Sequence, residues 1–279
     1  MRICFVTDLH GDPGHYEQLT NLLSAEQPEL LILGGDMHVD ARQDDPLGTQ
    51  VAYVQERVPA LCEAWRDDTP GLVIAGILGN HDLNCTVIAL RALHDAGYLV
   101  LLEHRQPWHY RGLNLLGLSM TPPSPYWVKD LERRDLPTDA VPETGGAVWH
   151  MNAGELCPVS AKEHFGRLPS LADELAAAPS VEDPWLFVCH SPPYNTALDR
   201  LPHLDYPIGS RAVRAFIERT GPLCALHGHV HESPEVTGKY ADRVGRTLCI
   251  NPGQSHDRLH AVMFDTADIP ATLRHTVYA

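Results

Sequence analysis

Leu226-His227-Gly228-His229-Val230-His231 places three histidines within five residues, directly after an apolar run that begins at Leu223. An apolar run that ends in histidines and small residues is typical of a buried strand that carries imidazoles to the rim of a sheet. His229 and His231 would share a face on a strand, and Gly228 would let the backbone pass close to a ligand. Ordinary surface histidines are the alternative, since the chain has 17 histidines. A metal site at a strand end is the hypothesis that the other strands must support.

Polar residues follow four other apolar runs in the same way. These runs, predicted to be buried strands, are Arg2–Val6, Leu30–Leu33, Leu72–Leu78 and Pro184–Cys189. Ligands of α/β sheets bind outside the carboxyl ends of the strands, so residues that follow these runs are expected to meet. Chance placement of such residues at successive strand ends is improbable. The candidate metal ligands are Asp8, His10, Asp36, Asn80, His190, His229 and His231.

Helical periodicity alternates with these strands. Helices are expected at residues 13–25, 50–66, 86–96, 162–178 and 210–219. A hairpin is expected at 108–118, and closing strands at 248–250, 261–265 and 272–277. The pattern predicts an α/β fold in one domain, residues 1–279. Residues 120–165 lack periodicity and are expected to form an irregular excursion across the open face of the sheet.

Composition narrows the range of partners. The chain of 279 residues has 36 acidic and 21 basic residues, a formal charge of −15, and no basic run. General affinity for nucleic acid or anionic membranes is therefore not expected, and a nuclease would lack a cationic track for the backbone. Seven cysteines, four of them inside apolar runs, indicate a reducing, cytoplasmic compartment. No apolar stretch approaches the roughly 20 residues of a membrane span.

The candidate ligands define the chemistry of the site. Imidazole, carboxylate and amide donors without a thiolate suit manganese, iron or zinc, and so many donors imply two divalent ions. Asp36, the acid that follows the second strand, is the natural bridge between them. Two dications outweigh Asp8, Asp36 and a hydroxide, so the centre stays positive and can bind an anionic phosphoryl group. A metal-activated hydroxide would attack phosphorus. His81 is the expected general acid for the leaving group, with Asp82 orienting its ring.

The motifs Asp8-x-His10, Gly35-Asp36, Gly79-Asn80-His81-Asp82, His190 and Gly228-His229-x-His231 resemble, in order and spacing, those of the calcineurin-like metallophosphoesterase superfamily. The resemblance spans Asp8 to about Gly253 and implies a four-layer α/β/β/α sandwich of two mixed sheets flanked by helices. It also implies one metal held by Asp8, His10 and His231, a second held by Asn80, His190 and His229, and Asp36 as the bridge. His81 would be the acid or the transition-state stabiliser.

Within the superfamily, His190-Ser191-Pro192-Pro193 and the opening stretch look most like the small bacterial phosphodiesterases. The resemblance implies hydrolysis of a small-molecule phosphodiester. A phosphomonoesterase or protein phosphatase fits less well, because the arginines that follow the Gly-Asp and Gly-Asn-His turns in those enzymes are absent here and Arg42 is out of register. A catalytically silent metal-binding scaffold is the third possibility, although no motif residue is missing.

Overall fold

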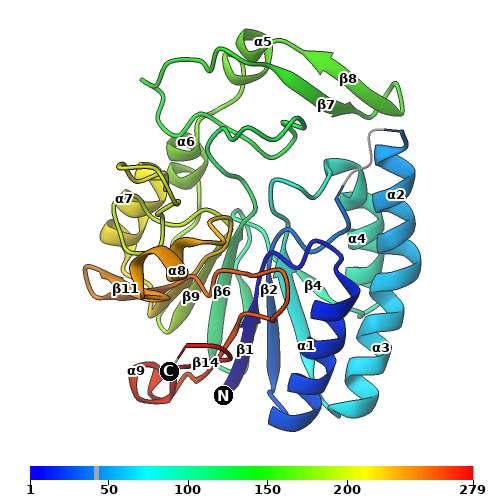
Figure 1. Ribbon diagram of the computed structural model, residues 1–279, viewed down its shortest axis with the longest axis vertical. Coiled ribbons are helices and arrows are strands. Elements are labelled where there is room, and N and C mark those ends of the chain that lie inside the picture. The colour runs from blue at the N-terminus through cyan, green and yellow to red at the C-terminus, as the bar shows by residue number, and fades with distance from the viewer. Residues whose placement is uncertain (41–43, 279) are drawn as a thin grey trace.

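Two six-stranded sheets form the centre of the structure, a computed structural model that describes residues 1–40 and 44–278 (Figure 1). The first sheet has, in spatial order, β14 (Arg274–His275), β13 (Ala261–Asp265), β1 (Arg2–Val6), β2 (Leu30–Gly34), β3 (Val73–Ile77) and β4 (Val100–Leu101). The second has β11 (Ala241–Val244), β12 (Thr247–Ile250), β10 (Cys224–Leu226), β9 (Trp185–Cys189), β6 (Leu113–Leu118) and β5 (Trp108–Tyr110). Both are mixed: β1 to β4 run parallel, as do β6, β9, β10 and β12, while β13 and β11 are antiparallel.

Alternation along the strands creates three apolar layers. In β1, Ile3 and Phe5 pack between the two sheets, whereas Cys4 and Val6 face the helices on the outside. In β9, Leu186 belongs to the layer between the sheets, and Phe187 to the outer layer of the second sheet. Strands buried on both faces are near-continuous apolar runs, which is why they are visible in the sequence.

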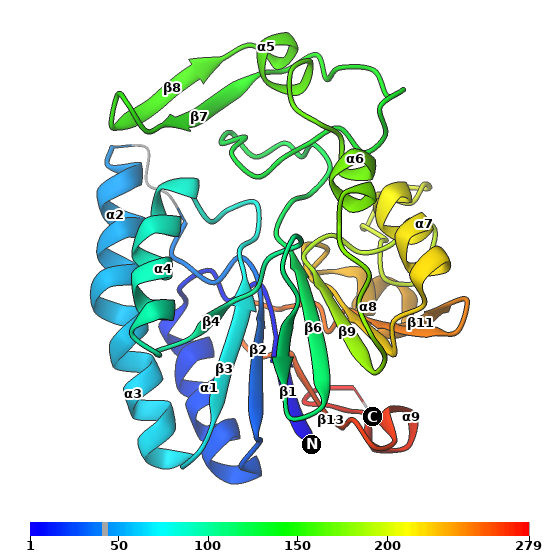
Figure 2. The same cartoon turned by 180° about the vertical axis from the view of Figure 1, so that it is seen from behind.

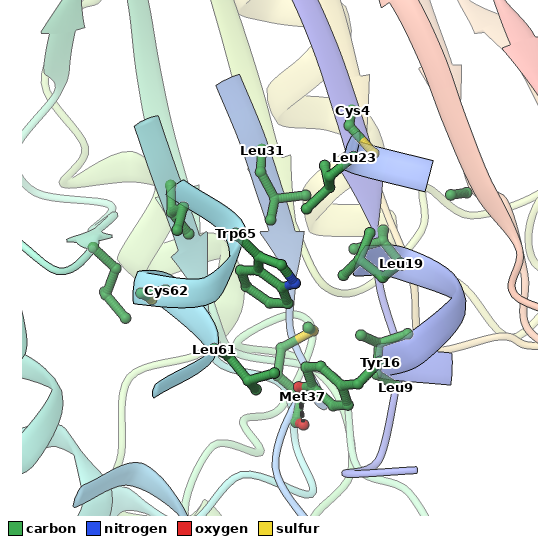
Figure 3. Close-up of a cluster of buried hydrophobic side chains, with 14 of the residues drawn as sticks. Cys4, Leu9, Tyr16, Leu19, Leu23, Leu31, Met37, Leu61, Cys62 and Trp65 are labelled. Carbon is green, nitrogen blue, oxygen red and sulfur yellow. Dashed lines mark hydrogen bonds between the residues drawn. The ribbon is translucent and has the colours of Figure 1, made fainter. Parts of the chain in front are cut away.

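Helices cover the outer face of each sheet. The first sheet is covered by α1 (Pro13–Glu26), α3 (Val58–Asp68) and α4 (Val87–Asp95), and the second by α6 (Leu171–Ala176) and α7 (Arg211–Thr220) (Figure 2). Figure 3 shows Leu23 of α1 and Trp65 of α3 beside Leu31 of β2. Burying side chains of this size contributes roughly 1.5–3 kcal/mol each. The predicted α/β/β/α sandwich is confirmed.

The parallel strands bring their carboxyl ends to one edge. Gly34 at the end of β2 pairs with Ile77 at the end of β3, and Val6 of β1 pairs with Leu33. In the second sheet, Leu226 of β10 pairs with Val188 of β9. The loops that carry the candidate ligands therefore leave both sheets at the same end of the molecule.

Two predicted helices are interrupted. The helix expected at 50–66 consists of α2 (Pro46–Ala52), a π-helical turn (Tyr53–Arg57) and α3, because Pro59 cannot donate the amide hydrogen bond that a regular helix needs. The helix expected at 162–178 is two helices, α5 (Ala161–Phe165) and α6, each with a serine capping box. Gly166 and Pro169 lie between them.

The excursion is more ordered than the sequence predicts. It contains an antiparallel hairpin of β7 (Gly146–His150) and β8 (Glu155–Val159), at the end of the molecule where the ligand loops lie (Figures 1 and 2). Trp149 and Leu156 of the hairpin pack in a cluster with Leu47 and Val51 of α2. Further elements that the sequence pattern does not predict are β11 and three short helices, η2 (Asn84–Thr86), α8 (Ser233–Thr237) and α9 (Ile269–Thr272). None of the helices in the described residues is long and apolar enough to span a membrane.

Candidate metal centre

Four of the seven candidate ligands have a left-handed backbone. The φ angles are 57° at Asp8, 46° at His10, 51° at Asp36 and 68° at His229. For residues other than glycine this conformation costs on the order of 1–3 kcal/mol and persists only where the surroundings impose it. Here the first two loops are joined by backbone hydrogen bonds from Asp8 to the Gly35 carbonyl and from His10 to the Asp36 carbonyl, both 2.9 Å. The backbone turns out of the strands so that these side chains face one another.

Glycines allow the loops to approach. A Cβ atom at Gly228 would collide with Thr7 Oγ1 and Asp8 Oδ2. A Cβ atom at Gly79 would collide with Asp36 Oδ1. The close backbone passage expected at Gly228 is therefore present, and it is directed at a candidate ligand.

One group of donors is formed by Asp8, His10 and His231. Nε2 of His231 lies 3.1 Å from Asp8 Oδ1 and 3.4 Å from Nε2 of His10. One ligand atom from each residue lies within 4.8 Å of the others, which is close enough for a shared ion. Asp8 comes from the first sheet and His231 from the second, so this group spans the two sheets.

A second group surrounds Asp36. Nε2 of His190 lies 3.2 Å from Asp36 Oδ2 and 3.8 Å from Asp8 Oδ1. Nδ1 of His190 lies 2.9 Å from the Gly34 carbonyl, to which it donates, and its Nε2 is buried with no hydrogen bond. Beside this group, His229 Nδ1 lies 2.9 Å from Asn80 Oδ1, and the rings of His229 and His190 are 5.3 Å apart. The structure thus brings together all seven candidate ligands.

The charges of the site fit divalent cations. Asp8 and Asp36 are almost fully buried, at 1% and 2% exposure, and two buried carboxylates need positive partners. Burial opposes ionisation of Asp8, but His231 and His190 outweigh it and hold its pKa at about 2. Burial also opposes ionisation of Asp36, and His190 keeps its pKa well below the usual value. A metal ion bound between these carboxylates and imidazoles would take over the positive charge of the protonated rings, and the rings would release their protons.

The pKa values of His190 and His229 are shifted in opposite directions. Burial would lower the pKa of His190, but Asp36 and Asp8 raise it to about 9. Burial lowers the pKa of His229 to about 3, with a further contribution from His190. His229 is therefore a neutral imidazole at pH 7, which is the form that binds metal.

His81 is oriented by a residue that was not predicted from the sequence. Its Nδ1 lies 2.9 Å from Asp40 Oδ1, and the same oxygen lies 3.0 Å from Nδ1 of His10. The ring of His81 stacks on Tyr126 with 3.8 Å between centroids. The signal that sequence reasoning missed is the position of Asp40, a carboxylate four residues after Asp36 in the loop at the strand end.

The predicted role of Asp82 is wrong. Its carboxylate is buried, accepts hydrogen bonds from the backbone N–H groups of Gly79 (2.9 Å) and His38 (3.0 Å), and lies 3.0 Å from His38 Nδ1. Successive side chains in the turn point in different directions. Asp82 therefore links the turn at Gly79 to the turn at His38, while His81 faces Asp40. His38 is the other member of this buried pair.

The loop of the opening stretch is supported from behind. The side-chain amide of Asn251 donates to the carbonyls of Gly228 (3.3 Å) and Val230 (3.0 Å). Nδ1 of His227 donates to the carbonyls of Cys189 and Ser191, both at 3.0 Å, in agreement with a structural role. Arg42, the arginine that is out of register with the motifs, lies outside the described residues.

The chain is similar to known proteins both in sequence and in fold. The sequence model described as calcineurin-like phosphoesterase matches residues 1–233. The structure is similar to that of TT1561 of Thermus thermophilus, at 14% identity and a TM-score of 0.61, covering 98% of this chain and 97% of that one. A further solved structure gives 14% identity and a TM-score of 0.62, covering 100% and 99%. At such identity these likenesses show the fold alone. No curated protein matches the chain.

The family match covers β1 to β4 of the first sheet, the excursion and the opening stretch with its histidines, but not β13 and β14. Members of this family are metal-dependent, and groups of residues that could hold metal are present here. The chain belongs to the calcineurin-like phosphoesterase family.

Proposed function

We propose that the chain is a phosphodiesterase that hydrolyses a small-molecule phosphate ester with two divalent metal ions, manganese, iron or zinc. One ion would be held by Asp8, His10 and His231, and the other by Asn80, His190 and His229, with Asp36 shared. The observation that carries this proposal is His190 Nε2, a buried atom without a hydrogen bond that lies 3.2 Å from Asp36 and 3.8 Å from Asp8. An imidazole nitrogen held between two carboxylates is a ligand set for a cation.

The metal ions and the residues around His81 have different proposed roles in the reaction. When bound, the two ions supply Lewis acidity that lowers the pKa of water and offsets charge on the phosphoryl oxygens. Asp40 holds His81 by Nδ1, which leaves Nε2 of His81 to give a proton to the oxygen of the leaving group. The Tyr126 ring, stacked on His81, limits the tilt of the imidazole. His81 is therefore the proposed catalytic residue.

The residues that come directly after the two turns favour a diester over a monoester. Met37 and His38 come after Asp36, and Asp82 comes after His81, so the positions next to the site hold the buried His38–Asp82 pair instead of arginines that would clamp a dianion. The net charge of −15 disfavours a polyanionic substrate such as nucleic acid. All seven cysteines are free and six are buried, which supports the proposed cytoplasmic location.

The test is a substrate panel with controlled metal content. The metal-free protein is loaded with Mn²⁺ and assayed with bis-p-nitrophenyl phosphate and p-nitrophenyl phosphate. A higher kcat/KM for the diester, lost on chelation and restored by Mn²⁺, is expected. A preference for the monoester would make the protein a phosphomonoesterase. A fully loaded sample without activity on either substrate would leave only the scaffold function.

A further inference from the structure

Ser124, in the excursion, contacts one of the proposed metal ligands. Its Oγ accepts a hydrogen bond from Asn80 Nδ2 at 3.4 Å. The serine stands between prolines in Pro122-Pro123-Ser124-Pro125, and the segment folds back so that Thr121 forms a bridge with Glu132. A residue 44 positions away from Asn80 thus reaches the site from outside the strand-end loops.

The hydroxyl hydrogen of Ser124 is donated to Glu132 and not to Asn80. Ser124 Oγ donates to Glu132 Oε1 at 2.5 Å and accepts a second hydrogen bond from the backbone N–H of Tyr126 at 3.1 Å. Glu132 is 0% exposed, and Lys129 Nζ lies 3.0 Å from its other oxygen. Burial raises the pKa of Glu132, while Ser124 and Lys129 oppose that shift. A hydroxyl has one hydrogen, so Ser124 can only accept from Asn80.

The hydrogen bond from Ser124 to Glu132 determines the orientation of the Asn80 side-chain amide. The two ends of an asparagine amide have nearly the same shape, and only their hydrogen bonds distinguish them. With Nδ2 toward Ser124, Oδ1 lies 2.9 Å from His229 Nδ1, inside the site. The reversed amide would place Oδ1 against a serine oxygen that has no hydrogen to give and would present an N–H group to a cation.

We propose that Ser124, oriented by the buried Glu132–Lys129 pair, is a positioning residue that holds the Asn80 amide with its oxygen toward the metal. The inference rests on the proposed function, because it assumes that Asn80 is a ligand. Partners that orient metal ligands typically contribute 10–100-fold to metal affinity. Ser124 should therefore affect one of the two ions and leave the other unchanged.

The test is calorimetric titration of the metal-free protein with MnCl₂, which does not depend on turnover. Wild type is expected to bind two ions. Ser124→Ala is expected to weaken one of them by ~10–100-fold, while Ser124→Thr, which keeps the hydroxyl, retains both. Glu132→Gln should weaken the same ion, because its amide can donate to Ser124 and free the serine hydrogen to face Asn80. Ser160→Ala is the matched control, since Ser160 also donates to a glutamate, Glu163, at 2.8 Å, in a helix cap outside the site.

A double-mutant cycle with Asn80→Ala shows whether Ser124 acts through Asn80. Adding Ser124→Ala to Asn80→Ala is expected to cause no further loss of affinity. Unchanged binding in both Ser124→Ala and Glu132→Gln, or additive losses in the double variant, would overturn the inference. If wild type binds two ions and cleaves the diester while Ser124→Ala and Glu132→Gln both bind normally, only this inference fails. If wild type does not bind two ions, the proposed function fails as well.

Discussion

The carboxylate of Asp40 joins His81 to His10: one oxygen lies 2.9 Å from Nδ1 of His81 and 3.0 Å from Nδ1 of His10, although 41 and 30 residues separate them from Asp40. The proposed acid and a proposed metal ligand therefore share one partner. Burial would lower the pKa of His10, but the hydrogen bond with Asp40 and the charge of Asp36 raise it to about 9. Asp40 thus affects both the metal site and the proton donor.

Asp40→Asn is expected to reduce both metal affinity and kcat, because an amide orients the two rings less strongly than a carboxylate. The product of the two reductions should be ~10–100-fold. Steady-state kinetics at saturating Mn²⁺, together with a metal titration, measures the two effects. The control is Asp45→Asn in the same loop, where Asp45 caps α2 through Gly48 N–H at 3.0 Å. Equal activity of Asp40→Asn and Asp45→Asn would show that Asp40 has no role at the site.

His81→Ala should lower kcat by at least ~10²-fold and leave the binding of two ions intact, because general acid catalysis is removed while the proposed ligands remain. Kinetics and a metal titration of the same preparation provide the test. His109→Ala, an exposed histidine in β5, serves as the control. An unchanged rate for His81→Ala would remove the catalytic role.

Removal of metal is expected to destabilise the protein, because Asp8 and Asp36 come from one sheet and His190, His229 and His231 from the other. An ion bound at 100 times its Kd adds about 2.7 kcal/mol, which corresponds to an increase in Tm of about 5–10 °C. Thermal melting with Mn²⁺ and with a chelator measures it. Identical curves would contradict a metal centre that links the sheets.

Stability should fall in mild acid because of His227, which is 0% exposed and whose pKa burial lowers to about 4. In the unfolded chain the pKa is about 6.5, so the unfolded state takes up a proton first as the pH falls. This contribution is fully present above pH 6.5 and is lost progressively toward pH 4, by on the order of 2 kcal/mol at pH 5. Urea unfolding of metal-free wild type and of His227→Asn at pH 7 and pH 5 tests this prediction. Between pH 7 and pH 5 the variant should lose less of its free energy of unfolding than the wild type. Parallel losses would contradict the prediction.

The sequence was sufficient to predict the strands that carry the site. Runs such as Leu30–Leu33 are apolar on both faces and stop at polar glycine turns, so both the strand and its end are visible locally. Convergence of the donors within each sheet follows from parallel pairing, which places the ends of β1, β2 and β3 at one edge of the first sheet and the ends of β9 and β10 at one edge of the second.

The features that the sequence did not reveal depend on distant contacts. The β7–β8 hairpin is only partly buried, and Trp149 packs near Leu47 and Val51, about a hundred positions away. The choice of Asp82 over Asp40 as the partner of His81 assumed that neighbours in sequence face each other. In the turn they do not, and the path of the loop after Asp36 decides which carboxylate reaches the ring.

The backbone N–H of His229 donates to both oxygens of Asp8, each at 3.1 Å, across 221 positions of the chain. During synthesis Asp8 leaves the ribosome long before its partner, and a nascent chain that ends before Leu226 holds five of the seven donors. Contacts so far apart in sequence form late. A growing chain therefore cannot assemble the complete centre, and the capacity to bind both ions arises only as the last strands are added.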